Sequence, residues 1–159
     1  MSIQSAIREG SINPSLAATD KSGAIRELLS GLVAAKAVDE QHEAELLTAI
    51  ERREELGSTG IGCGVAIPHA KHPFISQTTV GIGINDSGID FQSIDNEPTH
   101  LFFLVLSPHD QPAHHLQTLE FISRILSDDM LRRELRQART SSDVLQTLER
   151  HAADALTAV

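Results

Sequence analysis

Tryptophan and tyrosine are absent from the 159-residue chain and phenylalanine occurs only five times, so the core must be mainly aliphatic. The single cysteine, Cys63, excludes an internal disulfide framework and suits a reducing cytoplasm. No apolar run approaches the length of a membrane span, and the first residues show no signal-peptide pattern. We therefore expect a cytoplasmic protein without direct membrane insertion.

Basic residues are also scarce, with 13 against 22 acidic ones and a formal net charge of −9. This balance argues against a general nucleic-acid binder, although it leaves room for a partner with a basic face. Hydrophobic residues make up 40% of the chain, as in ordinary soluble domains. The length fits one domain with a sizeable core. We expect a single domain over residues 12–159, preceded by an N-terminal arm at 1–11.

Hydrophobic periodicity predicts alternating helices and strands, which favours an α/β layered domain. The near-continuous apolar run at 100–107 is typical of a central strand buried on both faces. In the helix that follows this strand we expect Leu116 and Leu119 on the buried face. We expect residues 85–88 to form a turn. The expected helices cover 20–36, 39–53, 113–126, a segment with Leu131 and Leu135, and one capped by Ser141; the expected strands cover 14–18, 65–67, 78–84 and 100–107.

The most informative stretch places a glycine-rich loop immediately before a histidine. Glycines let successive amide groups turn toward an anion, and the hydroxyls of Ser58 and Thr59 add donors near Gly60. Pro68 cannot donate to a sheet ladder, so a strand should end there and His69 should project from its end. Arg53 is the nearest cation with the planar fork that suits phosphate. The stretch, residues 53–72, reads R-E-E-L-G-S-T-G-I-G-C-G-V-A-I-P-H-A-K-H.

Two other interpretations of this loop fail on the residues themselves. Gly57 and Gly62 have the spacing of a P-loop, but Cys63 and Gly64 stand where a lysine and a hydroxyl residue are needed, so a nucleotide cradle is not expected. Cys63 could act as a nucleophile beside a histidine. Nothing in the sequence indicates a lowered thiol pKa, so an inert cysteine is the favoured interpretation.

The run from Glu54 to Ala70, E-x6-I-G-C-G-V-A-I-P-H-A, resembles the signature of enzyme IIA domains of the bacterial phosphotransferase system, of the fructose/mannitol/nitrogen-regulatory type. The likeness spans roughly residues 12–150. The glycine-rich loop of this chain is most similar to the same loop in the nitrogen-regulatory branch of the family. Further segments follow in the family's order: G-I-D-F at 88–91, D-N-E-P at 95–98, L-F-F-L-V-L-S-P at 101–108 and H-L-Q-T-L at 115–119.

The resemblance implies a three-layer α/β/α sandwich with a small mixed sheet and a phosphotransferase activity without a bound cofactor. His69 would accept a phosphoryl group from an HPr-type carrier. Arg53 and the loop of Ser58, Thr59 and Gly60 would stabilise it. The group would then pass to an enzyme IIB domain, or regulatory target proteins would respond to the phosphorylated state. In the family a histidine in the motif H-L-x-x-L lies against the phosphorylated one, and His115 matches it.

Several alternatives stay open at this point. A sugar-transport enzyme IIA of the fructose/mannitol type and a non-catalytic regulatory module would have the same fold. His69 and His72, with His114 or His115, could instead supply three imidazoles to a hydrolytic metal ion. That metal hypothesis is weak because His69 and His72 follow a proline and lack the i, i+4 spacing of a helical site. No role follows from the resemblance for His72, His109 or His114.

Overall fold

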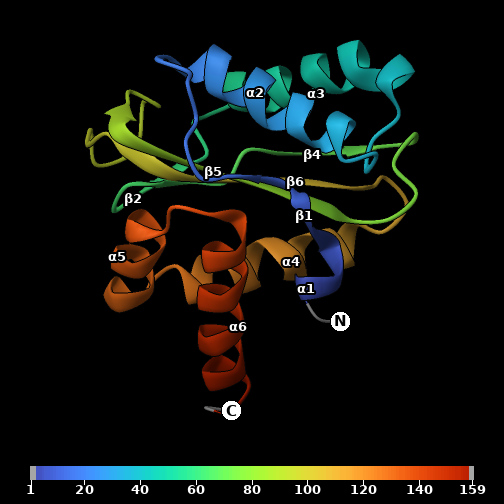
Figure 1. Cartoon of the computed structure of the whole chain (residues 1–159). Helices are drawn as coiled ribbons and strands as arrows, with labels where there is room; N and C mark the ends of the chain where they lie inside the picture. The colour runs from blue at the N-terminus through green and yellow to red at the C-terminus, as the bar shows by residue number, and fades with distance from the viewer. Residues whose placement is uncertain (1–2, 158–159) are drawn as a thin grey trace.

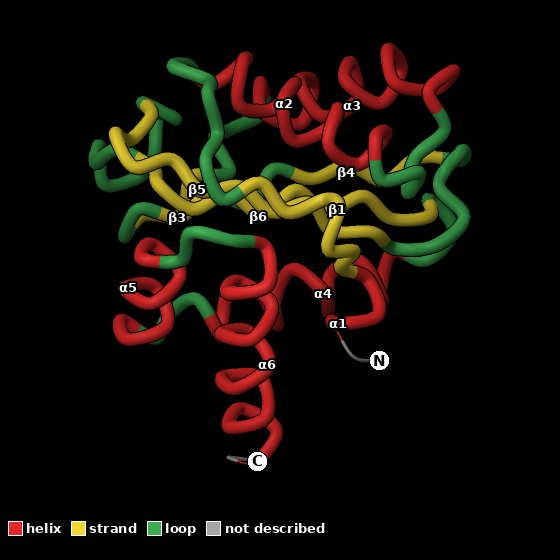
Figure 2. The backbone as a smooth tube through the Cα atoms, in the orientation of Figure 1, coloured by secondary structure: helices red, strands yellow, loops and turns green. Residues whose placement is uncertain are grey.

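The computed structural model describes residues 3–157 as three layers, with helices on both faces of one mixed sheet (Figure 1). Figure 2 shows the same layering, with strands in yellow between helices in red. This is the α/β/α sandwich that we expected. The strands are β1 (Ile7–Asn13), β2 (Gly60–Gly62), β3 (Val65–Ala66), β4 (His69–His72), β5 (Thr79–Ile89) and β6 (Thr99–Pro108); the helices are α1 (Ile3–Ala6), α2 (Lys21–Ala34), the short 3-10 turn η1 (Glu40–His42), α3 (Glu43–Glu55), α4 (Pro112–Ile125), α5 (Asp129–Gln137) and α6 (Ser141–Thr157).

The sheet is organised around β6. Strand order is β1-β5-β6-β3-β2, and β4 also pairs with β6. The contact between β5 and β6 is antiparallel, whereas β3 and β4 both run parallel to β6. Every residue of β6 except His100 is buried, which confirms the prediction of a central strand.

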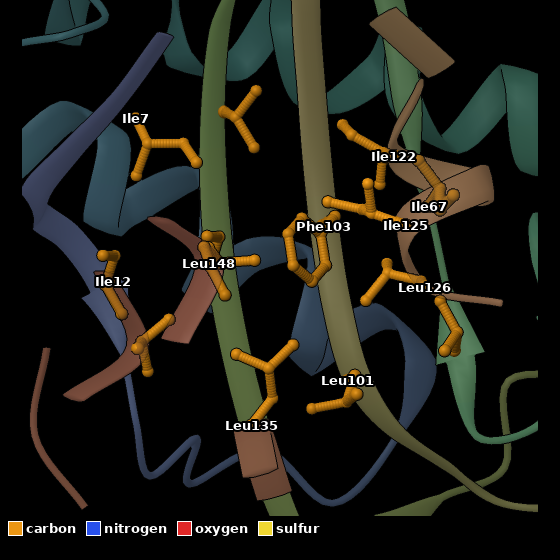
Figure 3. Close-up of a cluster of buried hydrophobic side chains, with 14 of the residues drawn as sticks. Ile7, Ile12, Ile67, Leu101, Phe103, Ile122, Ile125, Leu126, Leu135 and Leu148 are labelled. Atoms are coloured by element: carbon orange, nitrogen blue, oxygen red, sulfur yellow. The ribbon is translucent and has the colours of Figure 1, made fainter. Parts of the chain in front are cut away.

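Alternating residues of β6 face two separate cores, as a pleated strand requires. Leu101, Phe103 and Val105 face the layer of α4, α5 and α6, and this cluster is drawn in Figure 3. Phe102 and Leu104 belong to the opposite core, beneath α2 and α3. Most side chains in both clusters are aliphatic, as the composition predicts.

The N-terminal segment differs from our expectation. The strand lies at Ile7–Asn13, parallel to β5 on the sheet edge, and not at 14–18. Residues 7–11 are therefore part of the sheet and not of a separate arm. A register shift between Ile7 and Ile12 breaks the regular alternation, which explains why the sequence shows no clear period there.

The turn expected at 85–88 is an irregularity inside one long strand. Pairing with β6 is interrupted between Ile84 and Ile89, and Gly88 has a φ of 84°. The side chain of Asn85 donates to the carbonyl oxygens of Leu16 and Ala18 at 3.1 Å each. The turn-forming residues therefore hold the 14–18 segment against the sheet and do not reverse the chain.

The helices follow the predicted pattern with two local corrections. Asp20 caps α2 by accepting from the amide of Gly23 at 2.7 Å, but the last helix is capped by Thr140, not Ser141. Leu116 is 66% exposed because the buried stripe of α4 runs through His115, Thr118, Ile122 and Ile125. Within residues 3–157, no helix is both long enough and apolar enough to cross a bilayer.

Candidate functional site

A strand does end before Pro68, as expected, because β3 stops at Ala66. His69, however, does not project from the end of that strand but is the first residue of the next one, β4. Pro68 interrupts the chain between β3 and β4, and both short strands pair with β6. The Pro68 carbonyl still accepts from the amide of Val105 at 2.9 Å, so the break costs little sheet pairing. His69 is in register with Val105 and therefore lies on the α4 side of the sheet.

The imidazole of His69 is held in one tautomer. Its Nδ1 lies 2.8 Å from the carbonyl oxygen of Ile67. A carbonyl can only accept, so Nδ1 carries the hydrogen and Nε2 keeps its lone pair. Burial lowers the pKa of His69 below its usual value, and the positive charges of Arg53 and Lys71 add to this effect; the Ile67 bond and the charge of Glu54 oppose it. At neutral pH the ring is therefore an uncharged nucleophile.

His69 lines two adjoining open pockets, with volumes of about 470 Å³ and about 530 Å³. Arg53 lines both, and its Nη1 donates to the carbonyl oxygen of Gly57 at 2.9 Å, which fixes the guanidinium at the end of α3. Leu116 and Leu119 supply an apolar wall from α4. The predicted neighbours Arg53 and His69 thus meet at one depression of the surface.

His115 faces His69 from the start of α4, as we expected. The two ring centroids are 5.4 Å apart with an interplanar angle of 55°. His115 is buried, and burial together with the charges of His69, Lys71 and His114 lowers the pKa of His115 to about 4. Two neutral imidazoles therefore face each other at pH 7, and Nε2 of His69 keeps its lone pair.

Ser58 and Thr59 line one of the two pockets beside His69, whereas Gly60 lines neither. The hydroxyl hydrogens of Ser58 and Thr59 are donated to other groups. The Ser58 hydroxyl donates to the carbonyl of Phe91 at 2.7 Å and accepts from the amide of Gly60 at 3.0 Å. The Thr59 hydroxyl and amide both donate to the carboxylate of Glu54. A phosphate-binding role for this loop stays a prediction, and it requires some of these bonds to be exchanged.

Glu54 is a structural partner of the site that sequence reasoning missed. Its side chain is only 5% exposed, and it pairs with Lys21 at 2.8 Å besides accepting twice from Thr59. The available signal was helical spacing, because Glu54 continues the buried stripe of Leu46 and Ile50. In the sequence Glu54 stands between the charged residues Arg53 and Glu55, which hides this burial.

The other candidate ligands do not converge on His69. His72 lies three residues further along β4, so it faces the opposite side of the sheet, where its Nε2 is 3.8 Å from the carboxylate of Glu45. The metal site considered for His69 and His72 is therefore not formed. Among residues 3–157, no group of three or more His, Cys, Asp and Glu side chains is placed to hold a metal ion. Cys63 is exposed and its amide donates to Asp95 at 2.9 Å.

Comparison with known proteins adds family information to this geometry. A family model described as "Phosphoenolpyruvate-dependent sugar phosphotransferase system, EIIA 2" matches residues 5–151. A nitrogen regulatory protein of Bradyrhizobium diazoefficiens is 35% identical over 150 residues, covering 93% of this chain and 95% of the relative. A fructose-specific EIIA component of Haloferax volcanii is 38% identical over 128 residues, covering 80% and 82%.

Solved structures agree on the fold. The crystal structure of nitrogen regulatory protein IIA-Ntr from Neisseria meningitidis has a TM-score of 0.84 and 26% identity, covering 92% of this chain and 98% of that one. The IIA mannitol structure from Escherichia coli has a TM-score of 0.74, with coverage of 88% and 96%. At 23% identity, the mannitol protein supports the fold alone.

Proposed function

The chain belongs to the EIIA 2 family of the phosphoenolpyruvate-dependent sugar phosphotransferase system, and on this premise we propose that it is a phosphocarrier whose His69 accepts the phosphoryl group. The observation that carries this proposal is the bond from Nδ1 of His69 to the carbonyl of Ile67. It leaves Nε2 as the nucleophilic nitrogen beside the open pocket. Arg53 and His115 line the same depression.

The proposed reaction moves one phosphoryl group between two imidazoles. The lone pair on Nε2 of His69 attacks phosphorus in line, the new N–P bond forms, and the N–P bond of the donor phosphohistidine breaks. The bonding electrons return to the donor nitrogen, so no proton has to move and no nucleotide is consumed. Arg53 supplies positive charge and His115 an N–H donor to the phosphoryl oxygens.

The partners follow from the same role. An HPr-type phosphocarrier would be the donor, and an enzyme IIB domain or a regulatory protein would receive the group or respond to the phosphorylated state. One solved relative of the same fold is described as a complex of enzyme IIA-mannitol with phosphorylated enzyme IIB-mannitol. We favour the nitrogen-regulatory role because a relative so named matches 93% of this chain at 35% identity.

Two alternatives have specific support or a specific test. Sugar transport of the fructose type is supported by the 38% identical relative from Haloferax volcanii. Transfer of the phosphoryl group from this protein to a fructose-type enzyme IIB would favour that role. A non-catalytic binding module of the same fold would keep its partner binding after His69→Ala, and would not need phosphorylation.

The decisive assay incubates the protein with phosphoenolpyruvate, enzyme I and an HPr-type carrier, followed by intact mass measurement and an acid-lability test. We expect the wild type to gain one acid-labile phosphoryl group and His69→Ala to gain none. His72→Ala is the matched control, since His72 is on the same strand but the opposite face, and it should be phosphorylated normally. Stoichiometric labelling of His69→Ala would refute the site.

A further inference from the structure

His115 has a buried partner on the central strand that the proposed reaction does not yet use. The Oγ atom of Ser107 lies 2.6 Å from Nδ1 of His115. Ser107 is fully buried, and it is two residues beyond Val105, the β6 partner of His69. The serine therefore shares the α4 face of the sheet with His69, and it reaches His115 from the side away from solvent.

The direction of this hydrogen bond follows from the neighbouring groups. The hydroxyl of Thr78 donates to Oγ of Ser107 at 3.4 Å, which leaves the hydrogen of Ser107 for another acceptor. Because His115 is neutral at pH 7, one of its nitrogens is such an acceptor. Nδ1 then accepts from Ser107, and the ring hydrogen resides on Nε2. Within residues 3–157, Ser107 is the only side chain that forms a hydrogen bond with the His115 ring.

We propose that Ser107 is a positioning residue that holds His115 in the Nε2–H tautomer, with that N–H directed at a phosphoryl group carried by His69. The proposal rests on the phosphocarrier function above. The two histidines then have opposite tautomers for opposite tasks. His69 is held with Nδ1–H by a carbonyl acceptor, so Nε2 is a nucleophile; His115 is held by a hydroxyl donor, so Nε2–H is a donor.

Thr78 extends this arrangement toward a further histidine. Its Oγ1 is 3.2 Å from Nδ1 of His114 and 3.4 Å from Oγ of Ser107. With Thr78 donating to Ser107, the hydrogen of the His114 contact must come from His114. Three hydrogen bonds therefore run in one direction, from His114 through Thr78 and Ser107 to His115. Donors aligned in this way polarise one another, which strengthens the last N–H of the series.

The first test is the tautomer of His115 in the wild-type protein, measured from side-chain ¹⁵N chemical shifts at pH 7. We expect a protonated Nε2 and an unprotonated Nδ1 that accepts a hydrogen bond. A protonated Nδ1 would overturn the proposal, because Ser107 would then be an acceptor and His115 would present no N–H to the phosphoryl group.

The second test is kinetic and compares rates of phosphorylation by the HPr-type carrier. We expect Ser107→Ala to lower the rate about tenfold, the effect of losing one well-formed hydrogen bond. Ser11→Ala is the matched control, because Ser11 is also a buried strand serine but lies on the edge strand β1, and it should keep the wild-type rate. In a His115→Gln background, Ser107→Ala should cause no further loss.

The outcomes separate this proposal from the proposed function. If His115→Gln is slow but Ser107→Ala transfers at the wild-type rate, the positioning role is wrong and the phosphocarrier role stands. An undiminished tenfold effect of Ser107→Ala in the His115→Gln background would also overturn it, since the serine would then act through another group. If His69→Ala is still phosphorylated, the site itself is misassigned and both proposals fail.

Discussion

Replacing Glu54 by alanine should destabilise the protein strongly, because three polar groups lose their partner at once. The Glu54 carboxylate accepts from the amide and hydroxyl of Thr59 and pairs with Lys21 at 2.8 Å, while only 5% of its side chain is exposed. Removing one member of a buried ionic cluster typically costs about 3–5 kcal/mol, since the remaining charge and donors stay desolvated. For a domain of this length, that loss corresponds to roughly 6–20 °C in Tm.

Urea denaturation followed by circular dichroism measures this directly, with Glu55→Ala as the control. Glu55 is the exposed neighbour on the same helix, so its substitution should change the free energy of unfolding by less than about 0.5 kcal/mol. Adding Lys21→Met to Glu54→Ala should recover part of the loss, because the unpaired ammonium is then absent. A Glu54→Ala variant as stable as Glu55→Ala would refute the account of a buried ionic cluster holding the loop.

Three further results follow from the structure. Because the pKa of His115 is about 4 in the folded state against an ordinary 6.5, the free energy of unfolding should decrease by roughly 3 kcal/mol as the pH falls from 6.5 to 4. His115→Gln should abolish that part of the pH dependence of unfolding. Since the charge of Arg53 lowers the pKa of His69, Arg53→Leu should move the NMR titration midpoint of His69 upward; an unchanged midpoint would place the guanidinium too far away. Gly60→Ala should destabilise the protein by about 1–3 kcal/mol, because the added Cβ would lie 3.0 Å from the backbone Cα atom of Ser93. Gly31 is in mid-helix with open space around it, so Gly31→Ala should stabilise the protein by up to about 1 kcal/mol in the same denaturation assay.

The pairing of His69 with His115 was expected from the resemblance to enzyme IIA domains, in which a histidine of the motif H-L-x-x-L lies against the phosphorylated one. Local signals added only the frame: Pro68 predicts a break in the chain before His69, and the long apolar run of β6 predicts a central strand with a helix after it. Periodicity also predicted α2, α4 and the central strand, since these elements bury a regular stripe of side chains. Residue chemistry therefore predicted His69, Arg53 and the glycine-rich loop, whereas the family motif predicted His115.

The supporting contacts could not be predicted, because none of them follows the regular residue spacing of a helix or a strand. Ser107 appears in sequence as the end of an apolar strand, and only the tertiary packing of α4 places His115 beside it. The hydroxyls of Ser58 and Thr59 look like free donors until Phe91 and Glu54 are seen to accept from them. Such hydrogen bonds leave no periodic trace in the sequence, so only the folded structure shows which group accepts from which.

The measurement that most directly tests the central claim is the ¹⁵N spectrum of the His69 ring before and after phosphorylation by the HPr-type carrier. The bond from Nδ1 to the carbonyl of Ile67 leaves Nε2 free. We therefore predict that the ¹⁵N–³¹P coupling appears at Nε2 of His69, while Nδ1 keeps its hydrogen. Coupling at Nδ1, or at any other histidine, would contradict the account of the site.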